Sequence, residues 1–92
     1  MSKDTTKRAL HRLKIIQGQL SGLEKRIAED AYCMEILTQS RAIQKSLASL
    51  DGLIVSHHLE TRVQEMMTSG DEKQTKEALK ELAQLYEFNN KG

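Results

Sequence analysis

Apolar residues recur along the chain at alternating intervals of three and four positions, which is the spacing of one face of an α-helix. The first such row, or seam, comprises Ala9, Leu13, Ile16, Leu20, Leu23 and Ile27. The second runs through Ile36 or Leu37, Ser40, Ile43, Leu47, Leu50, Ile54, His58 and Thr61. Near the end of the chain a shorter stripe comprises Leu79, Leu82, Leu85 and Tyr86. The pattern predicts an all-α fold with helices over about residues 5–29, 30–69 and 72–87.

The ends of these helices are marked by few signals. Asp4 is a plausible N-cap for the first helix, and Asp30 can cap the second. Gly70 suits the left-handed position that follows a helix, and Asp71 or Ser69 can cap the third helix. The segment around Gly70 is therefore the clearest break that the sequence predicts.

Two further features of the helices predict close neighbours. Gly18 and Gly22 lie one turn apart inside the first helix, where glycine costs about 1 kcal/mol, so we expect a neighbouring backbone to approach them. Apolar residues also flank the second seam at Leu53, Val55 and Leu59. An apolar face this wide is typical of a helix that packs both against a helix of its own chain and against the same helix of another subunit.

The composition favours long helices in a small protein that oligomerises. The 92 residues contain 38% hydrophobic residues, no proline and three aromatic residues, one Phe and two Tyr. We expect a single domain over residues 1–92, and a domain of this size buries little of its surface alone. The sequence shows neither an apolar run long enough to span a membrane nor a secretory leader, and its single cysteine suits a reducing compartment. It predicts a cytoplasmic protein without a membrane partner.

The net charge of +1 hides an uneven distribution. The first 14 residues contain one acidic residue, Asp4, and five basic ones, namely Lys3, Lys7, Arg8, Arg12 and Lys14. A basic end is compatible with nucleic-acid binding, although a solvated helix face would have the same composition. Arg41 and Lys45, near the middle of the second helix, could widen the basic surface. We take Lys7, Arg8, Arg12, Lys14, Arg41 and Lys45 as candidate DNA contacts.

Cys33 and His58 carry the candidate chemistry. The 25 residues between them make about seven helical turns, so both side chains project from nearly the same face, but about 38 Å apart. One chain cannot bring them together. Two copies of the helix packed antiparallel around Gln44, Lys45 and Ser46 would join Cys33 of one copy to His58 of the other, twice. The alternative is a buried cysteine without chemistry, the commoner fate of a lone cysteine in a seam.

Arg62 stands one turn after His58, where a third ligand would belong. A guanidinium does not coordinate metals, but it stabilises a nearby thiolate. Cys33, His58 and Arg62 together favour a reactive thiol, or a soft metal with two protein ligands such as Cu(I), over zinc or nickel with a full set of ligands.

Four segments of the chain are distinctive: RLKIIQGQLSGL at 12–23, DAYC at 30–33, ILTQ at 36–39 and HLET at 58–61. Together they resemble the CsoR/RcnR/FrmR family of bacterial transcriptional repressors. The resemblance implies a three-helix protomer, antiparallel dimers with a four-helix core that assemble into tetramers, and an operator-binding repressor released by its effector. It also implies an effector site that combines Cys33 with His58 of another subunit, with Tyr32 and Arg62 beside it.

The resemblance leaves the effector open. Copper-sensing members generally have a thiolate or imidazole where this chain has Arg62, whereas formaldehyde sensors tolerate other residues there but typically have proline where this chain has Ser2. We expect Cu(I) or another metal as effector, with formaldehyde or another electrophile reacting at Cys33 as the alternative. A structural helical oligomer with an inert cysteine is the alternative from another class. No nucleotide-binding loop or catalytic triad pattern is present, so we do not expect an enzyme.

Overall fold

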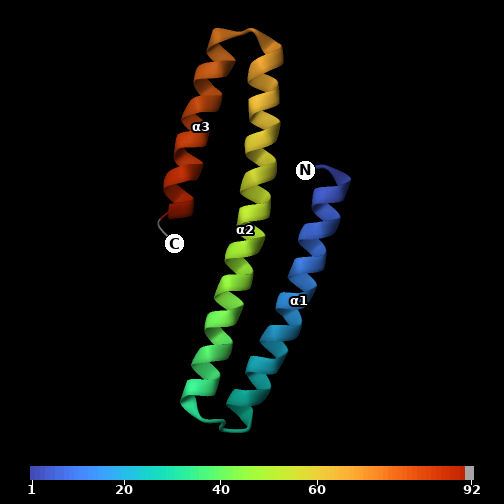
Figure 1. The fold of residues 1–92 in the computed structure, drawn as a ribbon, viewed down its shortest axis with the longest axis vertical. Helices are drawn as coiled ribbons and strands as arrows, with labels where there is room; N and C mark the ends of the chain where they lie inside the picture. The colour runs from blue at the N-terminus through green and yellow to red at the C-terminus, as the bar shows by residue number, and fades with distance from the viewer. Residues whose placement is uncertain (91–92) are drawn as a thin grey trace. The chain divides into compact units, whose positions relative to one another are not determined.

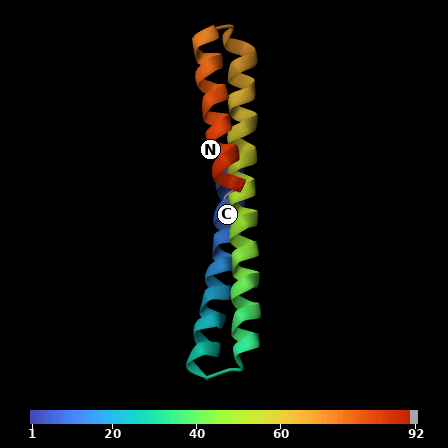
Figure 2. The same cartoon turned by 90° about the vertical axis from the view of Figure 1, so that its left-hand side faces the viewer.

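The computed structural model describes the backbone of residues 1–90 and the side chains of residues 1–88. It contains three helices, α1 (Lys3–Ala28), α2 (Cys33–Ser69) and α3 (Glu72–Asn90), and within residues 1–90 no strand. The predicted all-α fold is therefore confirmed. Contacts group into two units, one formed by α1 with α2 as far as Leu53, the other by α2 from Ile54 onward with α3. Each unit is an antiparallel helical hairpin (Figures 1 and 2). The prediction of a single domain stays a prediction.

Helix α1 begins one to two residues earlier than predicted, because Ser2 rather than Asp4 is its N-cap. The Ser2 hydroxyl accepts a hydrogen bond from the backbone N–H of Thr5 at 3.1 Å. Asp4 lies in the first turn instead, where a carboxylate interacts favourably with the helix dipole. The correction follows from serine and aspartate being equally good caps, so that the sequence alone offers two start points.

The turn between α1 and α2 corrects the role predicted for Asp30. Asp30 has a φ of 55° and follows the C-cap Glu29, so it ends α1 instead of capping α2. The N–H of Asp30 donates to the carbonyl of Ile27, and the N–H of Ala31 donates to that of Arg26. These two bonds form a Schellman motif, in which the left-handed position is usually glycine but tolerates aspartate. Helix α2 consequently begins at Cys33, three residues later than predicted.

The break between α2 and α3 is the predicted one. Gly70 has a φ of 64°, the left-handed conformation that glycine adopts without strain. Asp71 caps α3, since its Oδ1 accepts a hydrogen bond from the N–H of Lys73 at 3.0 Å. Helix α3 therefore starts at Glu72, as the sequence indicated.

The seam predicted on the first helix splits into two rows in the α1–α2 hairpin. Ala9 and Ile16 are buried against α2, whereas Leu13, Leu20 and Ile27 are between 38% and 57% exposed. On α2 the same division separates buried Ile43 from Leu47, which is 42% exposed. The hairpin therefore buries only part of each seam within the chain.

The exposed leucines of these seams lie along one edge of the hairpin. Arg12 and Leu13 lie about 50° to either side of the row of Ala9 and Ile16. On α2, Leu47 lies about 40° to one side of Ile43 and Ser49 about 120° to the other. Because Arg12 bonds to Ser49, those two residues mark one edge of the hairpin and the leucines mark the other. We call the second edge, with Leu13, Leu20 and Leu47, the apolar edge.

Within the residues that the structure describes, no backbone approaches the two glycines closely. A Cβ at Gly18 would have no atom within 4 Å, and at Gly22 it would meet only the Gln39 side-chain nitrogen, at 3.7 Å. The same nitrogen donates a hydrogen bond of 3.4 Å to the Gln19 carbonyl. Inside the hairpin, Gly22 therefore faces a side chain instead of a helix backbone.

Candidate functional site

Cys33 is the first residue of α2, and its thiol is free and exposed. The carbonyl of the preceding Tyr32 accepts hydrogen bonds from the N–H groups of Glu35 and Ile36, which fixes the first turn around the cysteine. The Tyr32 side chain is itself 71% exposed. Cys33 is thus presented at the surface of the protomer, not buried as a small core residue.

His58 also lies on α2 and is exposed. It lines an open groove of about 380 Å³ with four residues of α3, namely Glu81, Gln84, Leu85 and Phe88. Among the residues that the structure describes, no group of three or more His, Cys, Asp or Glu side chains converges as metal ligands do. The pairing of His58 with Cys33 across two subunits stays a prediction.

Arg62, one turn after His58, is held by two carboxylates. Its Nε lies 2.8 Å from Oε2 of Glu81 on α3, and its Nη1 pairs with Glu65 on α2. The Arg62 side chain is only 23% exposed, so these contacts fix the guanidinium between the two helices. The charge expected to act on a thiolate is balanced by two carboxylates within the protomer.

Neither Glu65 nor Glu81 is among the site residues predicted from the sequence. Glu65 follows Arg62 by three residues, a spacing at which side chains meet on a helix, so its pairing was accessible from the sequence. Glu81 belongs to α3, and its contact depends on the register of the α2–α3 hairpin. No local pattern reports that register.

The candidate DNA-binding residues occupy different sides of the α1–α2 hairpin. Five of the six are exposed, namely Lys7, Arg8, Lys14, Arg41 and Lys45. Arg12 is half-buried, and its Nη1 donates to the Ser49 carbonyl at 2.8 Å and to the Ser49 hydroxyl at 2.7 Å.

The Arg12–Ser49 contact brings three of these cations to one edge. Arg8 lies one turn before Arg12 on this edge, and Lys45 lies one turn before Ser49, where this edge of α2 meets its outward face. Because the helices are antiparallel, Arg8 and Lys45 lie on either side of that contact, at intervals of about 6 Å. We call Arg8, Arg12 and Lys45 the basic edge.

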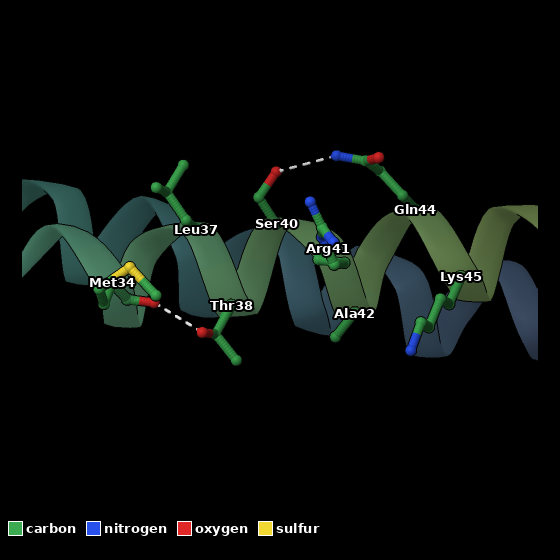
Figure 3. Close-up of a pocket in the computed structure, with 8 residues that line it drawn as sticks. All are labelled: Met34, Leu37, Thr38, Ser40, Arg41, Ala42, Gln44 and Lys45. Carbon is green, nitrogen blue, oxygen red and sulfur yellow. Dashed lines mark hydrogen bonds between the residues drawn. The ribbon is translucent and has the colours of Figure 1, made fainter.

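The outward face of α2 carries a shallow groove with mixed chemistry. Figure 3 shows Leu37, Ser40 and Gln44 on one side of the helix and Lys45 on the other. Met34 and Leu37 are more than half exposed there. All of the groove's lining residues come from α2, which is how a helix face looks when it has no neighbour within its own chain.

None of the helices, as far as the chain is described, is long and apolar enough to cross a membrane.

The sequence is similar to known repressors over most of its length. A family described as metal-sensitive transcriptional repressor matches residues 5–87. The copper-sensing transcriptional repressor CsoR of Mycobacterium bovis (strain BCG / Pasteur 1173P2) is 39% identical over 64 residues, which cover 66% of this chain and 54% of that protein. CsoR of Bacillus subtilis (strain 168) is 32% identical over 76 residues, which cover 83% of this chain and 72% of the relative.

A third relative is the copper-sensing transcriptional repressor RicR of Mycobacterium tuberculosis (strain ATCC 25618 / H37Rv). It is 34% identical over 59 residues, which cover 64% of this chain and 62% of RicR. The chain spans about half the length of the mycobacterial CsoR proteins that it matches. No solved structure gives a significant match. Since the family match extends from the first turn of α1 into the last turns of α3, this chain belongs to the metal-sensitive transcriptional repressor family.

Proposed function

We propose that the chain is an oligomeric DNA-binding repressor that leaves its operator when an effector, most simply Cu(I), binds Cys33 of one subunit and His58 of another. The observation that carries the proposal is the exposed Cys33 thiol at the start of α2 in a member of this repressor family. The named relatives are copper-sensing repressors, which favours copper among the metals.

The exposed apolar residues support an oligomer. The apolar edge holds three large side chains between 38% and 49% exposed, and Met34 and Leu37 continue an apolar surface on α2. Exposed apolar patches of this kind mark interaction surfaces. Packing α2 against an antiparallel α2 from a second subunit would cover them and complete a four-helix core, and two such dimers would form the tetramer.

The donor set supports a soft metal. A thiolate and an imidazole are ligands that Cu(I) accepts in low coordination number, whereas structural zinc requires four ligands. Bound Cu(I) would supply a bond between two subunits, and the protein's part is to hold Cys33 and His58 on facing helices. Arg62, paired with Glu65 and Glu81, contributes no ligand.

Formaldehyde is the second candidate effector, favoured by the exposed thiol and by Arg62 in place of a ligand. The Cys33 sulfur would add to the carbonyl carbon, and the carbonyl oxygen would take up a proton. The product is an S-hydroxymethyl group, formed with no leaving group and no oxidant. This reaction needs one cysteine and no metal.

The two effectors are separated by one experiment on the complete protein. We expect one equivalent of Cu(I) per subunit, under anaerobic conditions, to release a fluorescent promoter duplex from the protein, as followed by anisotropy. Formaldehyde at equal concentration should leave the complex intact. If formaldehyde alone released the DNA, formaldehyde and not Cu(I) would be the effector. If neither released it, a structural oligomer with an inert cysteine would be favoured.

A further inference from the structure

The basic edge contains one side chain that is anchored before any ligand arrives. Arg12 Nη1 donates to both the carbonyl oxygen and the hydroxyl oxygen of Ser49, at 2.8 and 2.7 Å. Both acceptors belong to one residue of α2, and the donor belongs to α1. The two hydrogen bonds therefore fix the guanidinium at a defined place on the edge of the hairpin.

The anchoring leaves the phosphate-binding side of the guanidinium available. Arg has five N–H donors, and the two on Nη1 are used by Ser49. Within the described residues Arg12 has no further hydrogen-bond partner, so the Nε and Nη2 donors face no protein acceptor. These two nitrogens form a fork whose geometry matches two oxygens of a phosphate.

We propose that Ser49 is a positioning residue for DNA binding: it holds Arg12 by Nη1 so that the Nε–Nη2 fork is set to receive a backbone phosphate. The inference rests on the proposed DNA-binding function and adds to it a role for a residue of α2. It selects Arg12, with Arg8 and Lys45 on either side, as the centre of the DNA-binding surface among the six candidate cations.

We expect the anchor to raise DNA affinity because the Arg12 side chain is already ordered before DNA binds. A free arginine side chain loses rotamer entropy when a phosphate immobilises it, and an anchored one has already lost that freedom on folding. Loss of the Ser49 hydroxyl removes one of the two anchors and leaves the backbone carbonyl. We therefore expect Ser49→Ala to weaken promoter binding about three- to tenfold.

The chain offers a matched control three residues away. The Ser46 hydroxyl donates to the Ala42 carbonyl of its own helix, at 3.1 Å, and does not anchor an α1 side chain. Ser46 is level with the expected α2–α2 crossing but projects about 130° from the face of Cys33 and His58. Ser46→Ala thus removes the same group from the same helix without touching Arg12 or that face. It should change promoter affinity less than twofold.

The test compares Ser49→Ala and Ser46→Ala in the parent and in an Arg12→Ala background, with a promoter duplex titrated over a range of salt concentrations. Ser49→Ala should lower affinity at each salt concentration while the slope of log K against log salt stays unchanged, because no charge is lost. It should have no further effect without Arg12, and Ser49→Thr, which keeps a hydroxyl, should restore most of the affinity. Thermal melting of each variant excludes unfolding as the cause.

The outcomes separate the inference from the proposed function. If Ser49→Ala bound the promoter as tightly as the parent while Arg12→Ala bound it weakly, the role of Ser49 would be wrong and Arg12 would remain a DNA contact. An equal loss in both backgrounds would also overturn it, since the hydroxyl would then act independently of Arg12. Unchanged affinity for Arg12→Ala would remove Arg12 from the DNA-binding surface and the role of Ser49 with it.

Discussion

Cys33→Ala should bind the promoter duplex as tightly as the parent and should no longer be released by Cu(I). The substitution removes the only thiol of the chain from the first turn of α2 and leaves the basic edge intact. Allosteric coupling between two binding sites typically changes affinity by about 5- to 150-fold. We expect that factor to fall below twofold in the variant, measured by anisotropy with and without one equivalent of Cu(I).

His57→Ala is the matched control for this experiment. His57 neighbours His58 but projects about 100° away on the helix, so its removal should leave the Cu(I) response intact. His58→Ala should lose the response as Cys33→Ala does. If Cu(I) still released the Cys33→Ala variant from DNA, the metal would act elsewhere and the proposed site would be wrong.

Arg12→Ala should weaken promoter binding about 10- to 100-fold, the second large effect that we expect. Each subunit of an oligomer contributes one Arg12, so the removal of a single phosphate contact is repeated in every subunit that touches the DNA. The slope of log K against log salt should become shallower by about one unit for each phosphate that the variant no longer binds. A salt titration of the variant and the parent gives both quantities.

Lys80→Ala on α3 controls for the loss of one positive charge. Lys80 is exposed and lies outside the α1–α2 hairpin that carries the basic edge. Its removal should change promoter affinity by less than threefold. Equal losses for the two variants would mean that overall charge, and not the Arg12 contact, governs binding.

The helices could be predicted from the sequence because their seams repeat with one period over long distances, and Gly70 marked the only break with a strong local signal. The errors occurred at the ends. Asp30 was read as an N-cap, yet it ends α1 in a left-handed conformation, and a lone aspartate between two helices is compatible with either role. The Schellman hydrogen bonds from Asp30 to Ile27 and from Ala31 to Arg26 show that it ends α1.

Which half of a seam packs within the chain could not be predicted. Ile16 and Leu20 are both apolar and belong to the same heptad pattern, yet Ile16 is 2% exposed and Leu20 is 49% exposed. A heptad pattern indicates that a helix has neighbours, but it does not distinguish a neighbour in the same chain from one in another subunit. Only the structure of the α1–α2 hairpin shows which seam residues are buried within the chain and which stay exposed.

For the candidate site, too, positions on one helix could be predicted, but contacts between helices could not. The spacing of Cys33 and His58 on one helix could be read directly from the sequence, and so could the position of Arg62 one turn later. The partners of Arg62 on α3 and of Arg12 on α2 could not, because each contact joins residues distant in sequence. The sequence therefore supplied candidate residues for the site, and the hairpins supplied the contacts that constrain two of them.

The proposed effector site requires Cys33 of one subunit to lie beside His58 of another. A His58→Cys variant tests it directly, because two cysteines separated by 25 residues of one helix are too far apart to pair within a chain. His57→Cys serves as the control, since that side chain projects from a different face. Under mild oxidation we predict a covalent dimer of the His58→Cys protein whose linked peptides join position 33 to position 58, and little linkage in the control. A His58→Cys protein that stays monomeric on a non-reducing gel, or that joins position 33 only to position 33, would contradict the account.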